Sequence, residues 1–215
     1  MSSKFSEKWE TMEEKGIREA LRPSDPLKPK IEQAIRRVQA QINRLNQAAE
    51  RLSQRDKAIF AKIVDAYAKH DMKRANVFAT ELAEIRKMET FMMHASLALE
   101  RVILRLRTVS QLGDVVVTLA PATTVLQKVT KGISGVLPTA ERELGQVGTL
   151  LSEIIFEAGH STGMTLDFEV ANEDARQILS EAAIVAEEKM KEKFPELPTG
   201  LTSAEKTSTG SGYDY

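Results

Sequence analysis

Few side chains in this chain occur at spacings that support catalysis or metal binding. Glu157 and His160 match the Glu-x-x-His spacing of di-iron helical bundles, but such a site needs a second copy of the motif and two further glutamates. The other histidines, His70 and His94, lie far from this motif, and the 215 residues include no cysteine. The glycine-rich phosphate loops and the Gly-x-Ser-x-Gly nucleophile motif do not occur in the sequence. The sequence therefore favours a protein that is not an enzyme and has no metal or other cofactor.

The spacing of the cations between residues 28 and 62 is more informative. This stretch contains nine Lys and Arg but only three Asp and Glu. Four of the cations recur every seven residues, and two others lie beside them on a helical wheel. These six residues, called the basic ridge, are Lys30, Arg36, Arg37, Arg44, Arg51 and Lys57. A ridge on one helix face can bind anionic lipid head groups or nucleic-acid phosphates, and the alternative is a solvated face with no binding role.

A long helix is required to hold this ridge straight, and heptad spacing predicts one. Residues 31–63 place apolar side chains at alternating steps of four and three, broken only by Asp56. Residues 78–106 repeat the pattern with two polar interruptions, and Lys69-His70-Asp71 between them is typical of a tight turn. Two such helices joined by so short a link must pair antiparallel. The predicted fold is all-α, with a long antiparallel hairpin over about 30–108 and shorter C-terminal helices.

The remaining segments divide the chain into four parts. An N-terminal amphipathic segment spans residues 1–22, and the helical core spans 27–165. After the hairpin we expect one helix over Val109–Ser134, interrupted at Pro121, and another over Thr139–Ala158. An acidic helix follows in residues 166–194, and a short motif and a disordered tail occupy 195–215.

The net charge of -1 hides an uneven distribution along the chain. Residues 1–110 contain 22 Lys and Arg against 15 Asp and Glu, a net +7, whereas residues 111–215 contain 8 and 16, a net -8. The acidic helix contributes much of this negative charge. Its main acidic residues are Glu173, Asp174, Glu181, Glu187 and Glu188. We hypothesise that this helix folds back on the basic hairpin, hides the ridge and holds an autoinhibited, closed monomer.

The sequence indicates contact with a membrane surface more than insertion across it. The longest uncharged stretch, Val115–Gln127, has 13 residues, fewer than the about 20 that span a bilayer. Phe5, Trp9 and Met12 are a candidate membrane anchor, because indole and aromatic rings prefer the head-group region. The alternative is that this segment docks on a partner protein. Since the chain has no cysteine, a reducing cytoplasm suits it.

Several stretches of the chain together resemble the ESCRT-III family. Residues 63–75 and 79–88 are similar to the hairpin tip and second-helix start of that family, most closely of the archaeal cell-division group called CdvB. Residues 104–109 and 112–117 are similar to the archaeal pattern that follows. The resemblance covers about residues 27–194. It implies a helical core that polymerises, alone or with paralogous subunits, into membrane-bound filaments at the division site and constricts the neck between dividing cells.

The resemblance also implies partners. Phe194, Pro195, Leu197 and Pro198 are similar to the motif by which this family binds MIT domains, so an AAA+ ATPase of the CdvC type is an expected partner. The alternative is a plain helix stop at Pro195. A membrane-recruiting Cdv protein is a further expected partner, although no winged helix is expected after residue 194.

The sequence therefore predicts a cytoplasmic, membrane-peripheral subunit that remodels membranes during cell division. One competing hypothesis is a soluble coiled-coil adaptor that does not polymerise. A second is a helical protein that compacts nucleic acid, which is disfavoured because no aromatic stacking platform accompanies the ridge.

Overall fold

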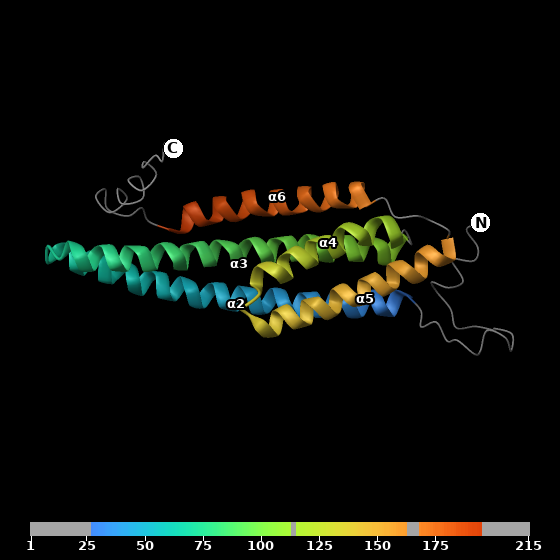
Figure 1. The fold of residues 1–215 in the computed structure, drawn as a ribbon, viewed down its shortest axis with the longest axis horizontal. Helices are drawn as coiled ribbons and strands as arrows, with labels where there is room; N and C mark the ends of the chain where they lie inside the picture. The colour runs from blue at the N-terminus through green and yellow to red at the C-terminus, as the bar shows by residue number, and fades with distance from the viewer. Residues whose placement is uncertain (1–26, 113–114, 163–167, 195–215) are drawn as a thin grey trace, which may run out of the picture.

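Five helices make up the part of the chain that the computed structural model describes, residues 27–112, 115–162 and 168–194. They are α2 (Leu27–Ala68), α3 (Met72–Leu112), α4 (Val115–Ile133), α5 (Pro138–Thr162) and α6 (Phe168–Lys193). These ranges contain no strand. The all-α prediction, with a long hairpin followed by shorter helices, is confirmed (Figure 1).

Helices α2 and α3 pair over their lengths because both follow the same heptad spacing. They have 42 and 41 residues, or about 60 Å each at 1.5 Å rise per residue. The predicted seam residues are buried or half-buried along both helices. The three polar residues that interrupt the spacing, Asp56, Glu89 and Ser96, are buried as well. They belong to the seam, although they cannot contribute apolar contacts to it.

The turn at the hairpin tip is closed by backbone and side-chain hydrogen bonds. His70 adopts a left-handed conformation with φ 57°, and the N–H of Asp71 donates to the carbonyl of Ala66 at 2.9 Å. This pattern ends α2 in the manner of a Schellman motif. The carboxylate of Asp71 then accepts a hydrogen bond from the N–H of Arg74 at 3.1 Å, which caps α3. The chain thus reverses between residues 69 and 71, where the sequence predicts.

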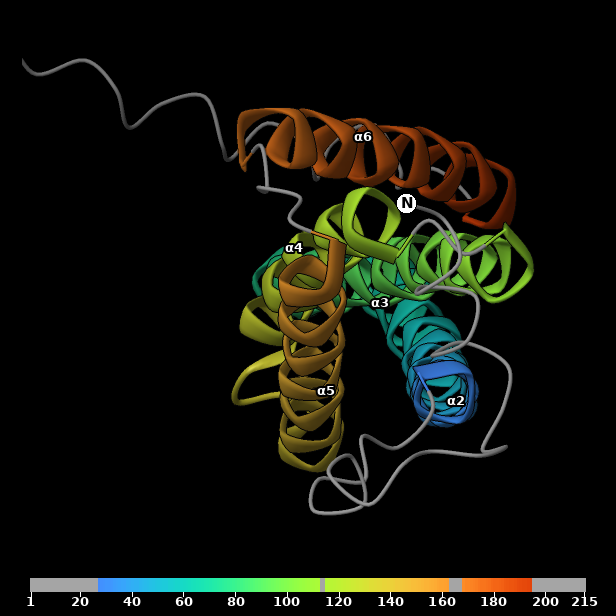
Figure 2. The ribbon, with the colours of Figure 1, turned by 90° about the vertical axis from the view of Figure 1, so that its right-hand side faces the viewer.

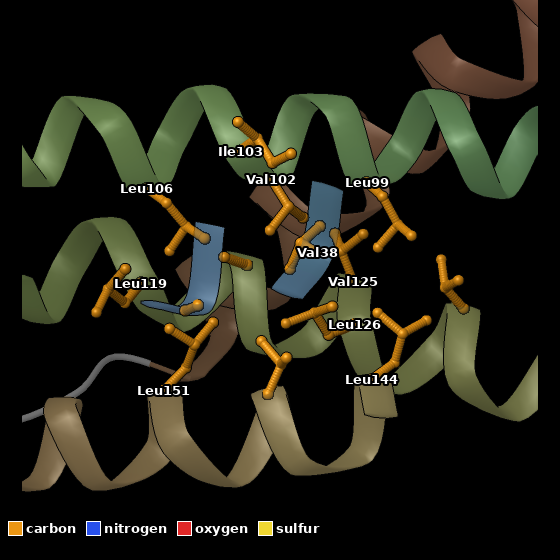
Figure 3. Packing of buried hydrophobic residues seen from close by; sticks show 14 of the residues in the cluster. Val38, Leu99, Val102, Ile103, Leu106, Leu119, Val125, Leu126, Leu144 and Leu151 are labelled. Atoms are coloured by element: carbon orange, nitrogen blue, oxygen red, sulfur yellow. The ribbon is translucent and has the colours of Figure 1, made fainter. Parts of the chain in front are cut away.

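The shorter helices pack around the end of the hairpin opposite the tip. α4 and α5 form a second antiparallel pair, with α4 also contacting α3 and α5 contacting α2, while α6 lies on α3 and α4 (Figures 1 and 2). One apolar core joins all five helices. Figure 3 shows part of it, with Val38 of α2, side chains of α3 and α4, and Leu144 and Leu151 of α5. The shorter helices therefore leave the hairpin projecting by itself only towards its tip (Figure 1).

The boundaries of α4 differ from the prediction. The α3 helix continues through Val109 to Leu112, and Pro121 lies inside α4 without ending it. A proline removes one N–H donor from the helix ladder. Next to it, the hydroxyl of Thr123 donates to the carbonyls of Leu119 and Ala120 at 3.0 and 2.7 Å. Burial of Pro121 and its neighbours in the core keeps this segment helical in spite of the lost bond.

Two glycines allow a direct test of this packing. A Cβ on Gly132 of α4 would lie 2.3 Å from Cζ of Phe91 on α3, whereas a Cβ on Gly145 of α5 would meet nothing within 4 Å. We expect Gly132→Ala to lower the free energy of unfolding by about 1–3 kcal/mol through overpacking. Gly145→Ala is the matched control and should raise it by up to about 1 kcal/mol, because alanine favours helix. Urea denaturation followed by circular dichroism measures both, and an unchanged or stabilised Gly132→Ala would contradict the close approach of α3 and α4.

Candidate anion-binding surface and its contacts

The first part of the basic ridge lies against α5. The ammonium group of Lys30 donates to both carboxylate oxygens of Glu157, at 3.1 and 3.2 Å, and Arg37 donates to the side-chain oxygen of Gln146 at 3.4 Å. A second buried line on α2 explains this contact, because Leu27, Ala34 and Gln41 recur every seven residues beside the seam. The α5 helix therefore partly covers the ridge at Lys30 and Arg37.

The second part of the ridge is exposed. Arg36, Arg44, Arg51 and Lys57 are exposed; Arg36 lies 3.9 Å from Glu32 on its own helix, and Arg44 donates to the side chain of Gln41 at 3.1 Å. Among the described residues, no acidic side chain lies within ion-pair distance of Arg44, Arg51 or Lys57. These four cations are therefore open to solvent.

Further cations extend this exposed face to the hairpin tip. Steps of 7, 4 and 7 residues from Arg44 keep to one face of α2, and a further step of 7 reaches the turn just after its end. The residues at these steps, called the distal basic stripe, are Arg44, Arg51, Arg55, Lys62 and Lys69. The sequence analysis assigned only Arg44 and Arg51 to a candidate site. Arg55, Lys62 and Lys69 could have been found there, because they occupy a single heptad position beside the seam.

Besides Arg44, which donates to Gln41, three stripe residues have partners on the hairpin itself. Arg55 pairs with Glu81 across the seam, and Lys69 pairs with Asp65 at 2.7 Å. The ammonium group of Lys62 lies 5.7 Å from the centroid of the Phe78 ring. Exposed ion pairs of this kind contribute little stability, so these cations can exchange their partners for another anion. The stripe is therefore the part of α2 that the structure leaves available for anionic ligands.

The acidic helix α6 folds back on the hairpin, but on the side away from the ridge. Glu181 pairs with Arg101, and Asp174 pairs with Arg105 at 3.2 Å, both on α3. The imidazole Nε2 of His94 on α3 lies 2.8 Å from the carbonyl oxygen of Leu179. Figure 2 shows α6 across α3 and α4 from α2, and it makes no contact with α2. The α6 helix does fold back on the hairpin, but the hypothesis that it hides the ridge is wrong, because the ridge lies on α2.

Glu173, Glu187 and Glu188 of α6 form no ion pair with the described residues of the hairpin. Glu173 pairs with Arg176 on the same helix at 3.3 Å, and Glu187 and Glu188 are exposed. Of the five acidic residues singled out in the sequence, only Asp174 and Glu181 therefore lie at the contact with α3.

The C-terminal end of α6 reaches a buried polar layer in the seam. Lys193 donates to a carboxylate oxygen of Glu89 at 2.7 Å, and Glu89 is fully buried on α3. One turn away along α3, the guanidinium of Arg86 pairs with the buried Asp56 of α2 at 2.7 Å. The ring of Phe194 lies over this same guanidinium, 4.7 Å from it. Burial raises the pKa of Glu89 above 4.5, with smaller contributions from Asp56 and Glu50, while Lys193 opposes the shift.

Several sequence predictions concern residues outside the described ranges. Phe194 is the only described position of the MIT-binding motif, since Pro195, Leu197 and Pro198 lie outside, as do Phe5, Trp9 and Met12 of the candidate anchor. Glu157 is an ion-pair partner of Lys30. In the described ranges, no group of three or more acidic, His or Cys side chains is placed to hold a metal ion. None of the helices in those ranges is both long and apolar enough to cross a membrane.

Two relatives resemble this chain along most of its length. Cell division protein B1 of Sulfolobus acidocaldarius is 39% identical over 208 residues, which cover 96% of each chain. Cell division protein B of the same organism is 35% identical over 162 residues, which are 75% of this chain and 62% of that protein. No family model and no solved structure matches the chain.

The raised pKa of Glu89 predicts a pH dependence of stability. In the folded state this carboxyl binds a proton at higher pH than in the unfolded chain, so lowering the pH through that range favours folding at this site. The free energy of unfolding of the wild type relative to Glu89→Gln should therefore rise as the pH falls from neutrality towards 4.5. Urea titrations of both proteins at matched pH values measure the difference. If the difference in free energy of unfolding stays constant or falls as the pH decreases, the raised pKa of the buried Glu89 is contradicted.

Proposed function

Because the chain belongs to the cell division protein B (CdvB) family and so takes part in cell division, we propose that it does so as an ESCRT-III-like subunit that assembles into filaments on anionic membranes. In this proposal the protein carries out no catalysis. It contributes a surface that binds lipid and a shape that packs with neighbouring subunits, and these together remodel the membrane at the division site.

The distal basic stripe is the observation that carries this proposal. It places Arg44, Arg51, Arg55 and Lys62 on one exposed face of α2 and Lys69 just past the end of that helix, in a row that runs towards the hairpin tip. Each cation near an anionic membrane contributes about 1 kcal/mol, less at high salt. A straight row of charges suits a surface of lipid head groups, which offers anions along the full length of the row.

The elongated shape supports assembly into filaments. The hairpin projects well beyond the five-helix end, so the two ends of the molecule present different surfaces (Figure 1). Contacts between unlike surfaces are heterologous, and they generate open polymers unless the rotation between subunits closes a ring. Paralogous subunits of the same shape can join such a polymer, which makes them expected partners together with copies of this chain.

The C-terminal end provides the link to an ATPase. The α6 helix ends at Lys193, and Phe194 begins the segment that is similar to MIT-binding motifs. We propose that an AAA+ ATPase of the CdvC type binds there, and that a membrane-recruiting Cdv protein assists the first contact with the membrane. In the same proposal the packing of α6 on α3 and α4 holds a closed form, and release of α6 frees surfaces of the base for assembly.

A soluble adaptor that does not polymerise is the competing function. The adaptor needs the hairpin only as a docking surface, so its binding to vesicles would be weak and independent of the stripe. Nucleic acid is a further possible anion for the stripe, and DNA at matched salt serves as the comparison in the experiment below.

Charge reversal of the stripe tests the membrane role. Arg44→Glu/Arg51→Glu/Lys62→Glu replaces three exposed cations that have no acidic partner among the described residues. Loss of three surface cations should weaken binding to anionic vesicles by on the order of 100-fold. Lys87→Glu/Arg107→Glu/Lys128→Glu is the matched control, because it changes three exposed cations off the stripe by the same total charge. Co-sedimentation with anionic and neutral vesicles, followed by electron microscopy of the pellet, measures binding and filaments.

The result separates the three hypotheses. Filaments on anionic vesicles, lost in the stripe variant and retained in the control, support the proposal. Equal loss in both triple variants would show that only net charge matters and would contradict a lipid-binding stripe. Tighter binding of DNA than of vesicles at the same salt would favour the nucleic-acid function, and a soluble monomer in every condition would favour the adaptor.

The closed form is tested by the ion pairs that hold α6. Arg101→Glu/Arg105→Glu places like charges opposite Glu181 and Asp174, so α6 should dock less firmly and polymer should sediment at lower protein concentration. The added Asp174→Arg/Glu181→Arg changes restore opposite charges and should return sedimentation towards wild type. A quadruple variant that behaves like the double variant would show that the effect does not come from these pairs.

A further inference from the structure

The hairpin contains two separate apolar clusters. The larger includes α2 as far as Leu45 and α3 from Met92 onwards, together with the shorter helices. The smaller lies towards the tip and consists of Ile59, Ile63, Ala66, Ala75, Leu82 and Ile85. Half-buried Leu52 packs against both clusters. The hairpin is therefore not one continuous core, and we call its tip part, residues 57–85, the distal arm.

A polar layer separates the two clusters. Ser53 and Asp56 of α2 and Glu89 of α3 are at most 2% exposed at seam positions or next to them, and Arg86 of α3 pairs with Asp56. Apolar side chains at these positions would have joined the clusters. Buried ion pairs contribute little or no net stability compared with apolar packing, because both charges lose their hydration. This layer is therefore the weakest cross-section of the seam.

The hairpin by itself cannot neutralise this layer. It provides two buried carboxylates, Asp56 and Glu89, and Arg86 is the cation that it places between them. The second cation is Lys193, whose ammonium group reaches Glu89 from the end of α6 at 2.7 Å. Phe194 covers the Arg86 guanidinium from the same side. The other carboxylate oxygen of Glu89, Oε2, is buried without a hydrogen-bond partner, and among the described residues the cation that pairs with this carboxylate is Lys193.

We propose that the polar layer is a joint, at which the distal arm bends relative to the five-helix end, and that the end of α6 stiffens this joint by supplying Lys193. When Lys193 leaves, the Glu89 carboxylate loses the cation that donates to it. This happens in the polar layer, where the seam lacks apolar contacts. An uncompensated buried carboxylate is strongly unfavourable. Near neutral pH it must either take up a proton, at a free-energy cost, or become hydrated, which requires α2 and α3 to separate locally, and both weaken the layer. The distal arm then opens as its own cooperative unit, apart from the base.

The joint gives the docking of α6 an effect far from its own binding surface. The distal arm carries Lys62 and Lys69 of the basic stripe, so a stiff arm keeps these two cations in line with the rest of the stripe, whereas a bending arm can follow a curved surface. This consequence rests on the proposed function, but the joint does not. Its test needs neither a membrane nor a filament, so failure of the joint and failure of the proposed function are distinguishable.

Hydrogen exchange of the full-length monomer at low concentration tests the joint. Lys193→Met removes the cation but keeps the aliphatic stem. We expect amides in residues 59–66 and 75–85 to exchange at least about tenfold faster, a change of about 1.4 kcal/mol in local opening, with residues 31–45 unchanged. Lys191→Met is the matched control, since Lys191 is exposed at the same helix end, and it should leave the distal arm as in wild type.

A second variant separates the lost charge pair from a damaged helix end. Glu89→Met/Lys193→Met removes the carboxylate together with its cation, so the layer carries only the neutral Asp56–Arg86 pair and slow exchange should return. The inference is overturned if Lys193→Met leaves exchange in the distal arm unchanged. It is also overturned if Lys191→Met has an equal effect, or if the double variant exchanges as fast as Lys193→Met alone.

Discussion

The heptad seam between α2 and α3 is the constraint on which the rest of the structure depends. Alternating steps of four and three keep one face of each helix in contact for about 60 Å, and every other described helix packs on this pair or on its neighbours. The seam also limits the molecule. Because Asp56 and Glu89 occupy it, the hairpin is divided into a base with a large apolar core and a distal arm with a small one.

The base requires the shorter helices, and their positions decide which surfaces remain free. Two helices alone leave much of their apolar surface in water, whereas α4, α5 and α6 enclose the base in one core (Figure 3). In doing so, α5 takes Lys30 and Arg37 out of the basic ridge. The cations further along α2, Arg44, Arg51, Arg55 and Lys62, stay exposed. The division of the core thus also divides the charge of α2.

Opposite charges are arranged on different sides of α3. The acidic α6 pairs with Arg101 and Arg105, while the distal basic stripe lies on α2, which α6 does not contact. Closing α6 therefore leaves the stripe accessible, so the closed monomer is compatible with lipid binding. The contacts that α6 covers belong to α3 and α4, and these are the surfaces that its release makes available. In the proposed function, attachment and assembly therefore depend on different faces.

The sequence by itself determined the two long helices, because heptad spacing is a local pattern, and the Lys69–Asp71 turn favoured a hairpin. An extended helix obeys the same heptads, so the closed arrangement is a result of the tertiary structure. The sequence also located the cations of α2 and the acidic segment that becomes α6. It did not decide which face α5 covers, since Leu27, Ala34 and Gln41 form a second buried line only once α5 supplies a surface to pack on. Pro121 was misjudged because burial in the core outweighs one lost hydrogen bond. The partner of Glu89 is Lys193, which lies 104 residues further along the chain. Only the tertiary structure brings the two together. The physical reason is desolvation, because a buried carboxylate binds whichever cation the fold places beside it.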